Sequence, residues 1–266
     1  MTASLAVKLL LTPALVVGAS LVARRWGPQV GGWLVGFPLT SAPVAVVLLL
    51  EHGPSFAAAA ALATLLGVLS QAVFAVAYTR TARRFAWPVC LAAGTFGFAA
   101  GTLALANLRL PAAFVAIFVA AGLTLALAAT PLTRGRIREA ELPAWDLPGR
   151  VLVATVFILV VTGLAGRLGP TLTGLLTPFP LYAAVLGVFA HVNEGRASAT
   201  AVMHGLLVGL YGFGAFFLVL GLLLVPFGPL VALAAAVAAV CAVQGTALLI
   251  AGRRPRREPA VESSSG

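Results

Sequence analysis

Charge is scarce in this sequence. Asp and Glu together supply 7 of the 266 residues, and all charged residues together make up 9%. Soluble domains carry about 25% charged residues, so a chain this poor in charge cannot cover a water-exposed surface with ionised groups. The shortage of acids also argues against a pump driven by carboxylates buried inside its membrane spans.

Cysteine and catalytic motifs are scarce as well. The two cysteines, Cys90 and Cys241, both lie in apolar runs and suggest no disulfide framework. The sequence holds no Walker loop, dinucleotide fingerprint, zinc-protease motif or nucleophile elbow. His191 and Glu194 have helical spacing but no further ligands to hold a metal. We therefore expect no enzymatic activity, no metal and no cofactor.

Apolar residues are abundant, at 61% of the chain with a mean hydropathy of +1.07. They form runs of about 20 residues, each long enough to cross a hydrocarbon core of about 30 Å. This pattern predicts an all-α polytopic membrane helix bundle of about nine transmembrane helices, with the lipid bilayer as its partner. The predicted spans cover residues 4–23, 30–50, 56–78, 86–107, 111–129, 150–166, 171–192, 197–225 and 227–251.

The net charge of +10 could suggest nucleic acid in a soluble protein. Here the arginines lie in short loops between spans, where basic residues report topology. With the N-terminus outside, 14 of the 17 basic residues fall in cytoplasmic loops, and only Lys8, Arg109 and Arg167 fall outside. We therefore expect a multi-pass protein of the plasma membrane, in a bacterium the inner membrane, with a cytoplasmic C-terminus and no nucleic-acid partner.

One segment of the sequence occurs twice. Residues 27–39 return at 169–181, an offset of 142, with both Gly-Pro and both Phe-Pro pairs aligned. At this offset the first four spans correspond to the sixth to ninth, and the fifth has no equivalent. An odd linker helix makes the two units cross the membrane in opposite directions, so the sequence predicts an inverted-topology repeat. The predicted domains are residues 1–109, the linker 110–149, residues 150–252, and a disordered basic tail 253–266.

The repeated Phe-Pro pair lies at the depth where a transport site is expected. Inverted repeats are typical of secondary transporters, whose sites lie near the midplane at the repeat interface. Each pair ends ten residues after its Gly-Pro proline, about 15 Å into a span. Proline removes a backbone donor and breaks the helix there; two ordinary kinks with packed phenylalanines are the alternative. The candidate substrate-binding residues are Phe37, Pro38, Thr40, Ser41, Thr177, Phe179, Pro180 and Tyr182.

Four charges stand at the ends of spans. Lys8 and Glu51 are predicted at the outer face, and Arg150 and Glu194 at the inner face. Because antiparallel helices that follow one another in sequence are usually neighbours, we expect two ion pairs, Lys8 with Glu51 and Arg150 with Glu194. The alternative is that the four side chains reach separately to lipid headgroups.

Residues 174–181, followed by Asn193-Glu194-Gly195, resemble the GlpM family of small bacterial inner-membrane proteins. Members of that family are single units of about this repeat's size, with a Lys early in the first helix and a Phe-Pro in the second. Lys8 and Phe37-Pro38 match this pattern, whereas Arg150 replaces the Lys in the second unit. The resemblance covers both units but not the fifth span. It implies a link to exopolysaccharide production and names no substrate.

These patterns lead to two hypotheses about function. The first is a transporter or channel for an unknown small solute, with its site at the Phe-Pro breaks. The second is a non-transporting scaffold or accessory protein for cell-envelope assembly. An intramembrane enzyme is disfavoured because no catalytic constellation is present. Either function is compatible with a homo-oligomer.

Overall fold

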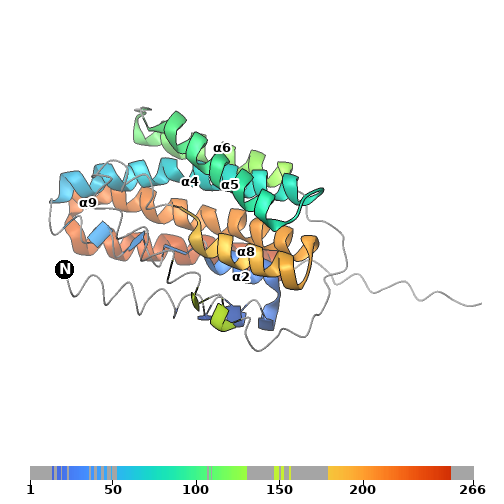
Figure 1. Cartoon of the computed structure of the whole chain (residues 1–266). Helices are drawn as coiled ribbons and strands as arrows, with labels where there is room; N and C mark the ends of the chain where they lie inside the picture. Colours follow the sequence, from blue (N-terminus) through green and yellow to red (C-terminus); the bar gives the residue numbers. More distant parts are fainter. Residues whose placement is uncertain are drawn as a thin grey trace, which may run out of the picture.

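The computed structural model describes residues 14, 17–18, 20–22, 24–35, 37–38, 41–42, 45–46, 49, 53–106, 108, 110–130, 147–149, 151–152, 156 and 179–252. Every regular element in these ranges is a helix, which confirms the all-α prediction for the described part. The helices are α2 (Pro28–Val35), α4 (Pro54–Ala82), α5 (Trp87–Leu105), α6 (Ala112–Ala129), α8 (Leu181–Asn193) and α9 (Arg196–Gly252). Figure 1 shows α5 and α6 on one side of α4 and α9 on the other.

Four of the described helices are long and apolar enough to cross a membrane. They are α4, α5, α6 and residues 196–247 of α9. Their hydropathy is in accord with a membrane location. α8 is also apolar but has only 13 residues. The predicted first and sixth spans lie mostly outside the described residues, so the number nine stays a prediction.

α9 consists of two helical arms that fold back on each other at Gly228. This glycine has φ 79° and ψ 171°, which is not helical, and it stands between Pro226 and Pro229. Across the fold, the side-chain amide of Gln244 donates from Nε2 to the carbonyl of Gly209 at 2.9 Å. The two arms therefore pack as an antiparallel hairpin (Figure 1). The predicted turn between the eighth and ninth spans is confirmed.

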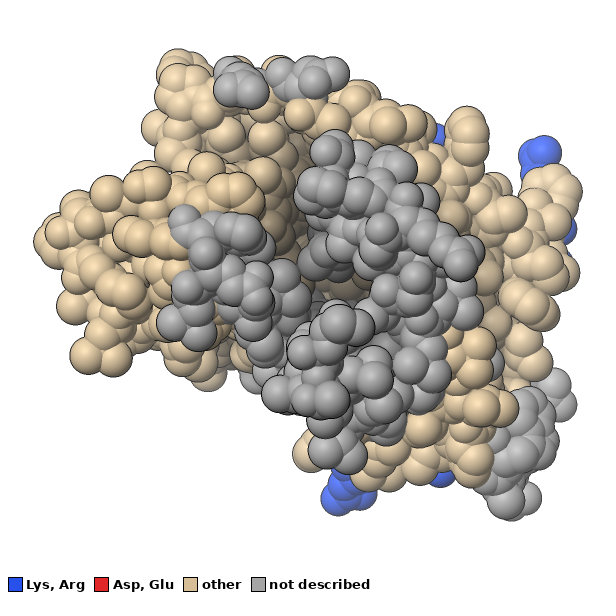
Figure 2. All heavy atoms as spheres, turned by 60° about the vertical axis from the view of Figure 1, so that its left-hand side comes forward, with Lys and Arg blue, Asp and Glu red and all other residues tan. Residues whose placement is uncertain are grey.

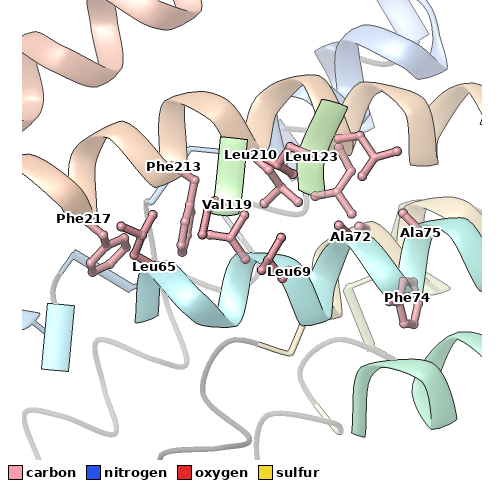
Figure 3. Packing of buried hydrophobic residues seen from close by; sticks show 14 of the residues in the cluster. Leu65, Leu69, Ala72, Phe74, Ala75, Val119, Leu123, Leu210, Phe213 and Phe217 are labelled. Atoms are coloured by element: carbon pink, nitrogen blue, oxygen red, sulfur yellow. The ribbon is translucent and has the colours of Figure 1, made fainter. Parts of the chain in front are cut away.

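The core is built on α4 and the first arm of α9, which run antiparallel. In Figure 3, Leu65 and Leu69 of α4 lie against Phe213 of α9, and Val119 and Leu123 of α6 complete the layer. A Cβ placed on Gly214 of α9 would lie 3.3 Å from Cδ1 of Leu65. Small residues at such contacts let membrane helices approach closely. The resulting van der Waals packing stabilises the helix pair in lipid, where the hydrophobic effect does not drive helices together.

Large apolar side chains also face outward, chiefly from α5, α6 and α9. Phe96 is 76% exposed and Leu125 is 71% exposed, and Phe114 and Ile117 are nearly as open. Figure 2 shows one face of the molecule on which Lys and Arg appear only at the edges. An apolar surface of this kind suits contact with hydrocarbon chains and would be costly in water.

Candidate functional site

The second Phe-Pro pair lies in a non-helical turn directly before α8. Pro180 has φ −77° and ψ 57°, and the N–H of Leu181 donates to the carbonyl of Phe179 at 2.8 Å. These values describe an inverse γ-turn centred on Pro180. The N–H of Ala184 then donates to the carbonyl of Pro180 at 2.8 Å, and α8 continues from there. α8 therefore starts directly after an inverse γ-turn at Pro180, and residues 157–178, which precede the pair, lie outside the described part of the chain.

The first Phe-Pro pair also lies outside helical structure. α2 ends at Val35, and the N–H of Phe37 donates to the carbonyl of Leu34 at 3.1 Å. Pro38 is not helical, and its carbonyl accepts from the N–H of Ala42 at 2.8 Å. Ala42 and Ala184 are separated by the repeat offset. Helical structure therefore starts through the same hydrogen bond after both Phe-Pro pairs.

The predicted site residues fall into two groups around these breaks. Phe37 is partly buried and packs against the main core, with its ring centroid 5.3 Å from that of Trp33. Ser41 is helical and partly buried, and Tyr182 packs with Leu181 and Val185 of α8. Thr40 and Thr177 lie outside the described residues.

Phe179 packs the turn before α8 against α4 and α5. Its ring meets that of Phe74 on α4 edge-on, with the centroids 5.9 Å apart. It also meets the ring of Phe98 on α5 edge-on, at 5.4 Å. Such edge-to-face geometry is favourable for aromatic pairs. In Figure 3 the ring of Phe74 points away from α9. Phe179 therefore packs against both α4 and α5.

Tyr78 and His191 extend this group of rings. The ring of Tyr78 stacks near that of Phe74, with the centroids 6.2 Å apart. Its centroid lies 6.1 Å from that of the His191 ring. The phenol oxygen of Tyr78 lies 3.3 Å from Nδ1 of His191. We call Phe74, Tyr78, Phe98, Phe179 and His191 the aromatic cluster. It joins α4 and α5 to α8 and to the turn before α8.

Two glycines leave room for the aromatic cluster. A Cβ on Gly94 of α5 would lie 2.9 Å from the ring of Phe74. A Cβ on Gly187 of α8 would meet the Met203 side chain and approach the Tyr78 ring at 4.0 Å. Sequence reasoning missed Tyr78 and Phe98, because their partners depend on how each helix is rotated. The available signal was an aromatic residue every fourth position, Phe74 then Tyr78, within one span.

Several buried polar atoms have no hydrogen-bond partner within the described part of the chain. They include Oγ of Ser70 on α4, Oγ1 of Thr102 on α5 and Oε1 of Gln244 on α9. A Cβ on Gly101 would lie 3.4 Å from Oγ of Ser70, so Ser70 and the Gly101-Thr102 step face each other. Thr102 and Gln244 are separated by the repeat offset. Buried polar groups in proteins are normally paired, so these atoms mark positions where a water or a solute could bind.

The cytoplasmic ion pair of the sequence prediction is only partly visible. Glu194 follows α8, where its N–H donates to the carbonyl of Ala190 at 2.9 Å. Lys8, Glu51 and Arg150 lie outside the described residues, so both pairings stay predictions. Next to Glu194, Nη1 of Arg196 donates to the main-chain carbonyl of Arg83 at 3.1 Å. This bond holds the end of α4 beside the turn between α8 and α9.

Within the described ranges, no group of three His, Cys, Asp or Glu side chains is placed to hold a metal ion. Comparisons with protein-family models, with curated proteins and with solved structures find no match for the chain. The GlpM resemblance therefore has no support beyond its short motifs. The geometry of the breaks and of the aromatic cluster is the basis for any functional argument.

Proposed function

We propose that the chain moves a small solute across a membrane by alternating access between two inverted units. The observation that carries this proposal is the pair of non-helical prolines, Pro38 and Pro180, each followed by a helix start with the same hydrogen bond. Discontinuous helices whose breaks lie at a repeat interface are the usual location of transporter sites. Phe179, directly before α8, packs against Phe74 of α4 and Phe98 of α5, which would belong to the opposite unit of the proposed repeat.

Helix boundaries support the duplication. α4 begins at Pro54 and α9 begins at Arg196, and these positions differ by the repeat offset. The residues just before them, Gly53 and Gly195, have φ values of 81° and 96°. Two equivalent glycines in the left-handed region, each directly before an equivalent helix, favour a common origin for the two units.

The packing of α4 on α9 supports the inverted relationship. Arg196 bonds to the Arg83 carbonyl at one end of the pair, and Gly221 approaches Ala58 at the other. The two helices therefore run antiparallel over their length. Val68 of α4 and Leu210 of α9 are both fully buried, and they correspond at the repeat offset. An axis in the membrane plane between the two helices would exchange the two units.

The aromatic cluster suggests how access could alternate and what the solute is like. A shift of α8 relative to α4 would separate Phe179 from Phe74 and His191 from Tyr78 without breaking a helix. The cluster offers aromatic rings, a phenol and an imidazole, and no carboxylate. That chemistry favours a solute with an apolar body over a metal ion.

The test is a cross-link between the units. Cys90 and Cys241 are replaced by Ser, Phe98 and Phe179 are replaced by Cys, and the protein is reconstituted in liposomes with a panel of small labelled solutes. We expect flux that stops on oxidation and returns with reductant. The ring centroids of Phe213 and Phe217 lie 4.8 Å apart on one helix. Their double Cys variant is the control, because a cross-link within one helix should not block flux. Flux that continues through the cross-linked Phe98–Phe179 variant contradicts alternating access at this interface.

A scaffold for an envelope complex is the second candidate function. The observation that favours it is the apolar packing of the described residues near both breaks, where Phe37 and Phe179 join the same core. The exposed apolar side chains of α5 and α6 would then contact a partner protein as well as lipid. Folded protein that passes no solute of the panel supports this candidate over the transporter.

A further inference from the structure

Four arginines gather at one end of the helix bundle. Arg80 lies in the last turn of α4, Arg83 and Arg84 follow it, and Arg196 begins α9. All four side chains are exposed, and the bond from Arg196 to the Arg83 carbonyl holds the two chain segments together. We call these four residues the arginine rim. Its parts come from positions more than 100 residues apart, so folding creates it.

Exposed apolar and aromatic side chains adjoin the arginine rim. Phe85 is 49% exposed, Trp87 is 39% exposed, and Val89 on the first turn of α5 is 46% exposed. Tryptophan and other amphipathic rings favour the boundary between headgroups and hydrocarbon. From Arg84 to Val89 the surface therefore changes from cationic to apolar, which matches the order of groups in a phospholipid.

Within the described part of the chain, positive charge exceeds negative charge around the arginine rim. The charged residues that the structure describes are Arg24, Arg25, Arg80, Arg83, Arg84, Arg196 and Glu194. Glu194 is the one acid in this described set, two residues before Arg196, so it cannot balance four guanidinium groups. Four exposed guanidinium groups at one end of the bundle attract anions.

We propose that the arginine rim binds the phosphate headgroup of an anionic phospholipid. Guanidinium groups match phosphate oxygens with two parallel hydrogen bonds, and Phe85, Trp87 and Val89 accompany the glycerol and the upper acyl chain. A free phosphate ion would use the arginines but not these apolar side chains, which is why a lipid is the better occupant. Basic clusters beside membrane helices are the usual partners of anionic lipids. The proposal does not depend on the transport hypothesis.

The test uses purified full-length protein in a neutral detergent, titrated with phosphatidylglycerol, phosphatidylcholine or inorganic phosphate. Lipid binding is measured by native mass spectrometry and by the rise in thermal midpoint. The rim variant replaces Arg80, Arg83 and Arg84 with Gln. It keeps Arg196 and the main-chain carbonyl of residue 83, and therefore keeps the bond between the two segments. The control variant replaces Arg253, Arg254 and Arg256 with Gln, which removes the same charge from the tail.

We expect the unchanged protein to bind phosphatidylglycerol more tightly than phosphatidylcholine. The rim variant should bind phosphatidylglycerol roughly tenfold more weakly or worse, and the tail variant within about twofold of the unchanged protein. Equal losses in the two variants would overturn the proposal, as would equal binding of the two lipids. Stabilisation by inorganic phosphate to the same extent would indicate an ion site and would also overturn it. If the rim variant does not fold, Arg84→Gln alone should weaken phosphatidylglycerol binding severalfold, and no change would again contradict the proposal.

Discussion

The phenol of Tyr78 and the imidazole of His191 lie 3.3 Å apart, although 113 residues of chain separate them. Tyr78 is fully buried on α4, and His191 is in the last turn of α8. This hydrogen bond joins α4 to α8, two helices that are distant in the sequence. It lies within the aromatic cluster, near the end of the bundle where Arg196 binds the Arg83 carbonyl. A polar link of this kind fixes the rotation of α8, which ring packing alone would leave less defined.

Replacement of Tyr78 by Phe tests this link. The ring keeps its packing but loses the oxygen that faces Nδ1 of His191, so the free energy of unfolding should fall by about 0.5–1.5 kcal/mol. Thermal or denaturant unfolding in detergent measures the change. Tyr211→Phe is a matched control, because its hydroxyl pairs at 2.9 Å with that of Thr124, which keeps its own bond to the Ala120 carbonyl when the tyrosine oxygen is removed. A larger effect at Tyr211 than at Tyr78 would contradict the structural role given to the buried pair.

A second prediction concerns the contact between α9 and α2. A Cβ on Gly205 would run into the carbonyl oxygen of Gln29 and come within 2.8 Å of the backbone nitrogen of Trp33. Backbone cannot yield as a flexible side chain can, so Gly205→Ala should destabilise the protein by about 1–3 kcal/mol. Gly214→Ala is the control, because its nearest neighbour is the end of the Leu65 side chain. Equal losses of stability at both positions would mean that α2 does not pack this closely.

Hydropathy alone predicted the long helices well. The predicted spans 56–78, 86–107 and 111–129 correspond to α4, α5 and α6, whose ends differ from the prediction by a few residues. Lipid requires every backbone polar group to bond within its own helix, so an apolar run of the right length has few alternatives. The turns were also predictable, because Gly53-Pro54 and Gly228-Pro229 combine a permissive residue with one that cannot continue a helix.

The candidate site was less predictable from the sequence. The predicted span 171–192 continued through Pro180, whereas α8 begins at Leu181, directly after the γ-turn; residues 171–178 lie outside the described part. Which rings surround Phe179 depends on the rotation of α4 and α5, and both helices are apolar on all sides. Without a polar face there is no periodicity to show which side of such a helix points inward. The contacts of Phe179 with Phe74 and Phe98 therefore could not be predicted from the sequence.

A third prediction concerns membrane topology and rests on the distribution of basic residues. A reporter fused after Ser265 should be active only in the cytoplasm, and one inserted near His52 only outside. An odd number of spans places the two ends of the chain on opposite sides, and basic loops stay in the cytoplasm. Fusions at each site to a phosphatase and to a fluorescent protein provide complementary readouts. Both sites on the same side of the membrane would contradict the nine-span prediction.

A fourth prediction concerns the expected ion pair of Lys8 and Glu51. Glu51→Lys should impair folding or activity, because it places two like charges together in a partly dry zone. Adding Lys8→Glu should restore some of the loss, since the pair is then reversed and not removed. An exposed pair would contribute at most about 1 kcal/mol, so a larger rescue indicates partial burial. No rescue in the double variant would mean that the two side chains reach the headgroups separately.

The last prediction tests whether Gly228, at the hinge of α9, is required for its backbone conformation or for the room that it leaves for neighbouring atoms. Gly228 has φ 79° and ψ 171°, a combination that only glycine adopts readily. No atom lies within 4 Å of a Cβ placed there, and the same is true of Gly245 in the second arm. Because the two sites differ in conformation and not in crowding, Gly228→Ala should lower the free energy of unfolding by about 1–3 kcal/mol. Gly245→Ala should instead raise it by about 0.5–1 kcal/mol, since alanine favours the helix. Denaturant titration in detergent measures both changes. An unchanged free energy of unfolding in the Gly228→Ala variant would mean that the chain turns between Pro226 and Pro229 without the positive φ. The hairpin would then not depend on glycine.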